Sequence, residues 1–267
     1  MIRQKMGDDS FFVFFRSCSM TIQKFFENNP RAALAFSGGV DSAFLLYAGI
    51  TYGQDITAYY VKSEFQPQFE LEDAKRLADE LGAKLKVIDL SVLADPNVKC
   101  NGPRRCYYCK RMIFNLITEQ AQQDGYSLLI DGTNASDDVD DRPGMQALKE
   151  LSVRSPLREC ELTKEEIRRL SQIAGLFTWN KPAYACLATR IPTGTEITEN
   201  DLHITECAEA ELSRLGFSDF RVRKIGDTAK IQLPEAKIKD LLGHRTEVVE
   251  RLKQYYKKIP LDLEVRS

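Results

Sequence analysis

Two cysteines stand three residues apart in NGPRRCYYCK, residues 101–110. Cys106 and Cys109 follow a polar loop and begin a segment with helical periodicity. Such a pair suits four roles: a zinc clip, a redox dithiol, part of an iron–sulfur ligand set, or two buried small residues. Zinc is disfavoured because the two histidines, His203 and His244, have no nearby ligand partner, and a redox dithiol normally sits in its own βαβ unit.

A second chemically suggestive stretch is SGGVDS, residues 37–42, placed between an apolar run and a helical segment. Its two glycines allow a tight turn in which backbone amides and a helix N-terminus face an anion, while Ser37 and Ser42 add hydroxyl donors. Asp41 could hold Mg²⁺ against bound phosphates. The stretch lacks the lysine of a Walker loop and the three-glycine spacing of a dinucleotide fold. The pattern therefore predicts a phosphate cradle of another type, and the alternative is a plain strand–turn–helix junction.

A third cysteine, Cys186, lies in KPAYACLATRIPTG, residues 181–194. Lys181 and Arg190 are expected to lower its pKa and to raise the fraction of thiolate, which a sulfur nucleophile requires. The alternative is a buried cysteine packed between alanine and leucine.

These residues need a scaffold, and the chain alternates short apolar runs with amphipathic segments. The runs 31–36, 56–61, 84–89 and 127–131 are typical of buried strands, and the segments 70–82 and 107–125 are typical of helices that end at glycine. Strands that alternate with helices predict an α/β fold with a parallel sheet, whose ligands bind at the carboxyl ends of the strands.

The pattern changes after about residue 160. Thr163 and Glu166 are placed as a capping box for one more helix, and a segment rich in Pro and Gly follows. A helix at 199–216, a hairpin that turns at Gly226 and Asp227, two short helices and a final strand at 261–265 predict a smaller second unit. We expect two domains, residues 1–185 and 186–267.

Composition narrows the class of protein. The 37 Lys and Arg residues balance 39 Asp and Glu residues, so the chain lacks the basic excess of a protein that grips nucleic acid over its whole surface. Seven cysteines are an odd number for a disulfide framework. The apolar run at residues 11–15 is too short for a secretion signal, and no stretch approaches the ~18 apolar residues of a membrane-spanning helix. We expect a cytoplasmic protein without a nucleic-acid or membrane partner.

Four motifs in order and spacing resemble the LarE family: SGGVDSAFLL, DGTNASDDVDDRPG, SPL and KPAYACLATRIPTGTEIT. The resemblance covers roughly residues 20–235. It implies an ATP-dependent sulfur transferase of the pyrophosphatase-loop (PP-loop) class, active in nickel-pincer nucleotide biosynthesis, with ATP and Mg²⁺ as cofactors. Such enzymes adenylate a carboxylate of pyridinium-3,5-biscarboxylic acid mononucleotide, release pyrophosphate and form a thiocarboxylate. In many members the cysteine that matches Cys186 gives up its sulfur and becomes dehydroalanine.

The same resemblance implies roles for further residues. It places ATP phosphates on Ser37, Gly38, Gly39, Asp41 and Ser42, and substrate phosphate on Arg221 and Arg223, which strand alternation puts on one face. Gly132, Thr133 and Asn134 follow a strand, where nucleotide binding and a plain turn are the alternatives. Gln232 stands where relatives lead us to expect an acidic residue, and Asp240 is another acidic candidate. Relatives assemble as hexamers, so we expect a homo-oligomer.

For Cys106 and Cys109, the resemblance to some family members implies a [4Fe–4S] cluster. These two cysteines and Cys186 would hold it, with one open iron that carries sulfide. Cys100 is an alternative ligand, and reduced, non-ligating cysteines are the alternative to a cluster. Two further functions stay open: a tRNA thiolase, and an ATP-binding regulatory module whose cysteines sense redox state.

Overall fold

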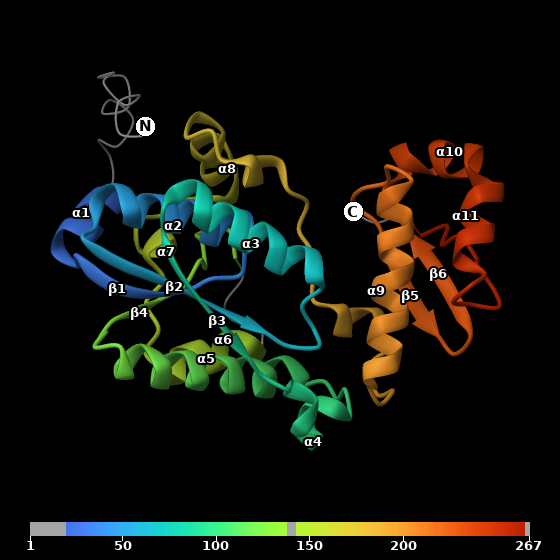
Figure 1. The fold of residues 1–267 in the computed structure, drawn as a ribbon, viewed down its shortest axis with the longest axis horizontal. Helices are drawn as coiled ribbons and strands as arrows, with labels where there is room; N and C mark the ends of the chain where they lie inside the picture. Colours follow the sequence, from blue (N-terminus) through green and yellow to red (C-terminus); the bar gives the residue numbers. More distant parts are fainter. Residues whose placement is uncertain (1–19, 138–142, 265–267) are drawn as a thin grey trace.

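The structure is a computed structural model that describes residues 20–137 and 143–264 (Figure 1). The apolar run at 11–15 and residues 138–142 of the DGTNASDDVDDRPG motif lie outside the described residues.

A four-stranded parallel sheet forms the centre of the first unit, as the sequence predicts. Its strands run in the order β3-β2-β1-β4. β1 pairs with β2 from Arg31–Asp55 to Ala35–Tyr59, and β4 pairs with the other edge of β1. The strand order reverses beside β1, which places a crevice at the carboxyl end of that strand. The strands are β1 (Arg31–Ala35), β2 (Asp55–Lys62), β3 (Lys84–Asp89) and β4 (Leu129–Ile130).

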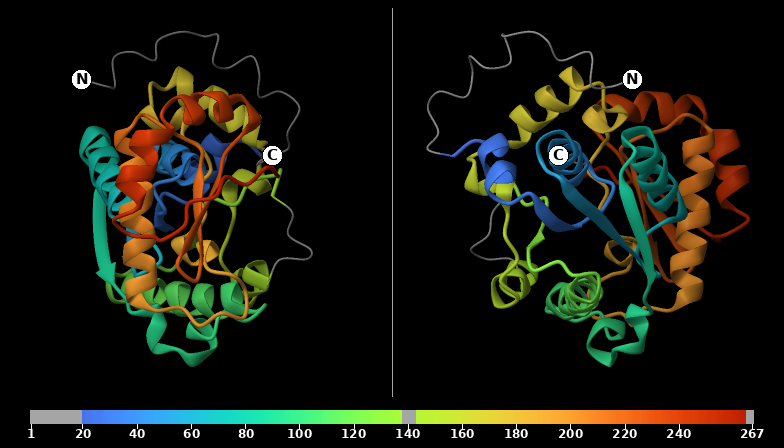
Figure 2. Two further views of the ribbon diagram at one scale, coloured as in Figure 1. Left: turned by 90° about the vertical axis from the view of Figure 1, so that its right-hand side faces the viewer. Right: turned by 60° about the vertical axis from the view of Figure 1, so that its left-hand side comes forward.

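Helices cover both faces of this sheet (Figures 1 and 2). One group packs around the large apolar cluster that contains Phe25, Leu45 and Ile167, and α5 packs on the opposite face around Tyr59 and Ile117. The first group comprises α1 (Ile22–Asn28), α2 (Val40–Tyr52), α3 (Gln68–Leu81), α7 (Pro156–Glu159) and α8 (Lys164–Ile173). The other face carries α5 (Arg105–Gln123) and α6 (Pro143–Glu150), and α4 (Pro96–Lys99) contacts α5.

Local signals set the ends of two helices that matter for the site. α3 ends at Gly82, which takes the left-handed conformation with φ 62°, and its N–H bonds to carbonyls of the last turn. α8 begins with the predicted capping box, in which Thr163 and Glu166 each accept a hydrogen bond from the other's backbone N–H. The capping box fixes the start of α8 and with it the position of Lys164, the first helical residue.

The prediction that 84–89 is a buried strand is wrong in one respect. β3 forms, but it is an edge strand, and most of its side chains are exposed. Lys84 pairs with Asp55 at 2.8 Å and Lys86 pairs with Asp124 at 2.6 Å. Lysines on an exposed edge discourage pairing with another chain, and this accounts for charged residues in an apolar run.

The second unit has its own core around Val222, Ile231 and Leu252. The predicted hairpin is confirmed and turns at Gly226, whose φ is 56°. The predicted strand at 261–265 is wrong over its described part, residues 261–264, where Leu261 forms an isolated bridge with Ile231, as Lys258 does with Thr228. Figure 1 shows this unit beside the parallel sheet, with α9 (Glu199–Arg214), β5 (Arg221–Ile225), β6 (Thr228–Gln232), α10 (Glu235–Gly243) and α11 (Arg245–Leu252).

A connector, residues 174–198, joins the two units and contains short 3-10 turns at Phe177–Asn180 and Leu187–Arg190. Leu187 and Ala188 pack against Phe65 and Val98 of the first unit. The domain boundary between 185 and 186 stays a prediction, and the connector brings Cys186 to the first unit. Across the described ranges 20–137 and 143–264, no helix combines the length and apolar character needed to cross a membrane.

Candidate active site

The stretch 37–42, which we call the phosphate-binding loop for its predicted role, follows β1 and runs into the first turn of α2. Gly38 has φ +71°, and a Cβ there would lie 3.3 Å from the backbone oxygen of Glu70, so glycine is required both by conformation and by space. The hydroxyl oxygens of Ser37 and Ser42 lie 3.1 Å apart, and the Ser42 hydroxyl also lies 3.2 Å from the Gly39 carbonyl oxygen. Gly39 caps α2 without a side-chain bond to the helix, so the first-turn amides remain suited to an anion.

Asp41 lies in the first turn of α2 and carries two different oxygens. One lies 2.5 Å from Nζ of Lys164, and the other is buried without a hydrogen-bond partner among residues 20–137 and 143–264. Burial raises the pKa of Asp41, and Lys164 opposes that shift. A buried carboxylate oxygen with no partner fits a hard cation such as Mg²⁺, because the cation supplies the missing interaction.

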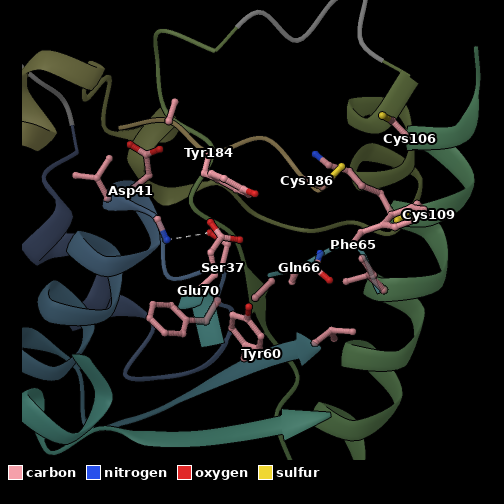
Figure 3. Close-up of a pocket in the computed structure, with 18 of the residues that line it drawn as sticks. Ser37, Asp41, Tyr60, Phe65, Gln66, Glu70, Cys106, Cys109, Tyr184 and Cys186 are labelled. Atoms are coloured by element: carbon pink, nitrogen blue, oxygen red, sulfur yellow. Dashed lines mark hydrogen bonds between the residues drawn. The ribbon is translucent and has the colours of Figure 1, made fainter. Parts of the chain in front are cut away.

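A cavity of about 460 Å³ lies at the carboxyl ends of β1 and β2, next to this loop. It is rich in positive charge, which suits a polyphosphate and a carboxylate substrate. Figure 3 shows Ser37 and Asp41 toward one end of this cavity and the three cysteines toward the other. The cationic side chains that line it are Arg105, Lys110, Lys164, Arg168 and Lys181.

Sequence reasoning assigned no role to four of these cations. Arg105, Lys110, Lys164 and Arg168 come from the starts of α5 and α8, two helices distant in sequence from the loop. Their signals were present, since Arg105 and Lys110 flank the cysteine pair and Lys164 follows the capping threonine. Only the fold shows that the two helix starts face one cavity.

The three predicted cysteines line this same cavity, and we call them the thiol wall: Cys106, Cys109 and Cys186. Cys106 is exposed, while Cys109 and Cys186 are half-buried. The six described cysteines carry no disulfide. Within residues 20–137 and 143–264, no group of three or more His, Cys, Asp or Glu side chains is arranged to hold a metal ion. The fold thus gathers the predicted cluster ligands on one wall without forming a ligand set.

The prediction that Cys186 has a lowered pKa is wrong. Burial raises the pKa of the Cys186 thiol, and Arg105 is the largest opposing influence. Lys181 instead pairs with Asp73 at 2.7 Å. Arg190 has only a small lowering effect, because its buried guanidinium pairs with Glu209 at 2.8 Å. Burial also raises the pKa of Cys109 to about 12.

Arg105 and Arg190 fix the connector around Cys186. Arg105 donates to the Ala188 carbonyl at 3.1 Å and lies 3.7 Å from the Cys106 sulfur. Arg190 donates to the Ala185 carbonyl at 2.6 Å. Glu209, the partner of Arg190, also accepts the Tyr184 hydroxyl hydrogen at 2.6 Å. The two arginines hold the carbonyls on both sides of Cys186.

Gly132, Thr133 and Asn134 lie beside the phosphate-binding loop but do not line the cavity. A Cβ on Gly132 would lie 2.9 Å from the Ser42 nitrogen, so glycine allows β4 to approach α2. Thr133 donates to Asp131 at 2.6 Å, and the Asn134 side-chain oxygen accepts the Ser136 N–H at 2.8 Å. These contacts show how the loop is built, and a role in nucleotide binding stays a prediction.

Arg221 and Arg223 lie on one face of β5, as predicted, with Val222 buried on the other. Arg221 lines a second cavity of about 610 Å³, on whose wall Lys181 and Tyr184 also lie. Arg223 bonds to Gln232 and to the Thr189 carbonyl, at 3.0 Å for the carbonyl. Gln232 in turn donates to Asp262. The substrate-phosphate role of the two arginines stays a prediction, as does any role of Asp240.

The parallel sheet, the loop at residues 37–42 and the three cysteines around one cavity are features of a PP-loop enzyme that transfers sulfur. Residues 31–99 match the family model of queuosine biosynthesis protein QueC. An uncharacterized protein of Synechocystis is 38% identical over 251 residues, 91% of this chain and 92% of the relative. The pyridinium-3,5-bisthiocarboxylic acid mononucleotide synthase of Lactiplantibacillus plantarum is 37% identical over 236 residues, 87% and 86% of the two chains.

The protein is therefore an ATP-dependent enzyme that transfers sulfur. It belongs to the LarE family, that of the Lactiplantibacillus synthase. A more distant relative, the tRNA-specific 2-thiouridylase of Thermotoga petrophila, is 25% identical over 193 residues, 57% of this chain and 54% of that one.

Proposed function

We propose that this chain adenylates a carboxylate of pyridinium-3,5-biscarboxylic acid mononucleotide and replaces the activated oxygen with sulfur. The products are a thiocarboxylate, AMP and pyrophosphate. The observation that carries this proposal is that the phosphate-binding loop and the thiol wall line a single cavity. The name of the 37% identical relative supports the choice of substrate, because that name describes the bisthiocarboxylic product.

The first step is activation of the carboxylate. A carboxylate oxygen attacks the α-phosphorus of ATP, and the bond from that phosphorus to pyrophosphate breaks. The loop amides and Lys164, which line this end of the cavity, would hold the phosphates. Mg²⁺, held by Asp41, would neutralise charge on the phosphate oxygens.

The second step is transfer of sulfur from Cys186. The Cys186 thiol gives up its proton to solvent as its sulfur attacks the acyl carbon, and AMP leaves with the electron pair of the C–O bond, which gives a thioester. Loss of the Cα proton of Cys186 then breaks the Cβ–S bond, and the bond electrons go to sulfur. The thiocarboxylate departs and Cys186 becomes dehydroalanine, so the atoms balance without an external oxidant or reductant. Each chain would turn over once by this route.

The [4Fe–4S] prediction concerns a catalytic alternative to this single turnover. Cys106, Cys109 and Cys186 lie on one wall, but the described residues form no ligand set for a metal. We therefore derive no step through a cluster. The cluster stays a prediction, and the absorbance spectrum of protein purified without oxygen tests it.

Other predictions also belong with this proposal. A tRNA thiolase has weaker support, because the thiouridylase relatives are distant and the net charge of −2 gives no basic excess. A regulatory module that only binds ATP would release no pyrophosphate in response to the mononucleotide. We also predict that the chain forms a homo-oligomer, expected to be a hexamer, and its mass in light scattering tests this prediction.

The deciding experiment supplies ATP, Mg²⁺ and the biscarboxylate mononucleotide to protein purified without oxygen. We expect pyrophosphate release that depends on the mononucleotide, together with a thiocarboxylate detected by mass spectrometry. Loss of the mass of one hydrogen sulfide from the chain would identify Cys186 as the donor. Pyrophosphate release that requires tRNA and ignores the mononucleotide would overturn the proposal.

A further inference from the structure

Glu70 is a carboxyl group in the cavity that the proposed chemistry does not use. It lies on α3, and its backbone oxygen is 3.3 Å from the position that a Cβ of Gly38 would take. Its side chain lines the cavity and makes no hydrogen bond or ion pair with the described residues. Burial raises the pKa of Glu70 to about 7, against the lowering influence of Lys181 and Arg190.

The hydroxyl group of Tyr60, beside Glu70, also lacks a hydrogen-bond partner among the described residues. The Tyr60 side chain is 1% exposed and lines the cavity, and its hydroxyl is buried without a hydrogen-bond partner in the described part of the chain. Burial raises the pKa of Tyr60, and Glu70 is the largest charge that adds to the shift. Figure 3 shows Tyr60 and Glu70 close to Ser37. An unpaired buried hydroxyl lowers the stability of the fold, which argues for a role beyond packing.

The cations around Glu70 are already committed to other groups. Lys181 pairs with Asp73, Arg190 pairs with Glu209, and Lys62 donates to the Gln66 carbonyl. The missing partner of Glu70 is therefore a hydrogen-bond donor from outside the chain. A ligand cation is disfavoured at this point, because five cationic side chains line the same cavity.

We propose that Glu70 accepts hydrogen bonds from the hydroxyl pair of a nucleotide ribose, and that Tyr60 donates its hydroxyl hydrogen to the same carboxylate once the ribose is bound. The proposal rests on the proposed function, because both ligands of that reaction are ribonucleotides. A carboxylate is suited to a ribose diol because it can accept from both hydroxyls at once. The position of Glu70 beside the loop supports a ribose, since its side chain lines the same cavity and its backbone oxygen would lie 3.3 Å from a Cβ on Gly38.

The test separates the two possible sources of the ribose. Calorimetric titration of the full chain in Mg²⁺ compares ATP with 2′-deoxy-ATP and 3′-deoxy-ATP. A second titration compares the biscarboxylate mononucleotide with its 2′-deoxyribosyl analogue. We expect the wild type to prefer ribose by about tenfold in one of the two titrations. The Glu70→Leu variant should lose that preference, and Glu70→Gln, which keeps one acceptor oxygen, should retain part of it.

Tyr60→Phe and Glu72→Gln complete the design. Tyr60→Phe removes an unpaired hydroxyl, so the melting temperature should hold or rise while the preference for ribose falls. Glu72 is exposed on the same helix, and its variant should bind like the wild type. The ATP titration needs no turnover, so it decides the ATP case even if the proposed carboxylate substrate is wrong. Equal binding of ribose and deoxyribose forms by the wild type, or an unchanged preference in Glu70→Leu, would overturn the proposal.

Discussion

The two ends of the cavity differ in how fully their side chains are held by the protein. At the phosphate-binding loop, Ser37 and Ser42 bond within the loop and Asp41 pairs with Lys164. On the thiol wall, the described contact of the exposed Cys106 is a 3.7 Å approach by Arg105. Local backbone can build an anion site almost alone, whereas the thiol wall depends on the packing of the connector against α5. The chemistry of sulfur transfer is therefore the part most sensitive to tertiary contacts.

The sharpest way to separate the two ends is to remove the nucleophile. Cys186→Ser should lower thiocarboxylate formation at least about 10³-fold, because the sulfur atom itself is lost. Pyrophosphate release should remain measurable, since the activation step uses the other end of the cavity. Quantifying both products from the same reaction checks this prediction, with Cys207→Ser on α9 as the matched control. Equal loss of both products would mean that the two ends do not act independently.

The opposite change removes the charges at the loop. Lys164→Met should slow pyrophosphate release by about 10²-fold, because a cation near the transferred phosphates is lost. The Asp41→Asn variant should show a comparable loss and a weaker dependence on Mg²⁺ concentration. Initial rates across a Mg²⁺ titration measure both effects. Arg169→Met, a change on the same helix outside the cavity lining, provides the control, and an unaltered rate in Lys164→Met contradicts the prediction.

How much of the site could be predicted from sequence follows the same division. The loop at 37–42 was predictable because its residues are contiguous, and glycine spacing reports backbone geometry directly. The parallel sheet and the capping box at Thr163 were predictable because short apolar runs and the spacing of Thr163 and Glu166 are also local signals. The pKa of Cys186 was not, because burial is a tertiary property, and the neighbouring Lys181 is drawn away by Asp73 on α3.

The Cys106 and Cys109 pair provides a third test, directed at the thiol wall alone. If the predicted cluster forms, protein purified without oxygen should absorb broadly in visible light, and Cys106→Ser should abolish that band. The variant should then form one equivalent of thiocarboxylate per chain at most, while the wild type forms more. Absorbance, iron content and product per chain measure this outcome, with Cys207→Ser, outside the cavity lining, as the control. A colourless wild type that loses one sulfur per chain leaves Cys186 as the single-use donor.

The smallest expected effect lies between the two ends, at Glu70. Its pKa is about 7 in the fold against a usual value of 4.5, so the folded chain keeps a proton that the unfolded chain loses between these values. Rising pH through this window should therefore destabilise the wild type, by on the order of 1 kcal/mol after solvent screening. Glu70→Gln lacks this loss, so its stability relative to wild type should increase from pH 4.5 to pH 8.

Urea unfolding of wild type, Glu70→Gln and the exposed control Glu72→Gln over this pH range measures the difference. The sign of the result also distinguishes two structures of the cavity. An ion pair between Glu70 and Lys181 would lower the Glu70 pKa, and wild-type stability would then rise with pH relative to the variant. Because Lys181 is bound to Asp73 at 2.7 Å, we expect the opposite slope. If wild-type stability falls with rising pH relative to Glu70→Gln, Glu70 enters the cavity without a protein partner. A ligand hydroxyl requires this condition.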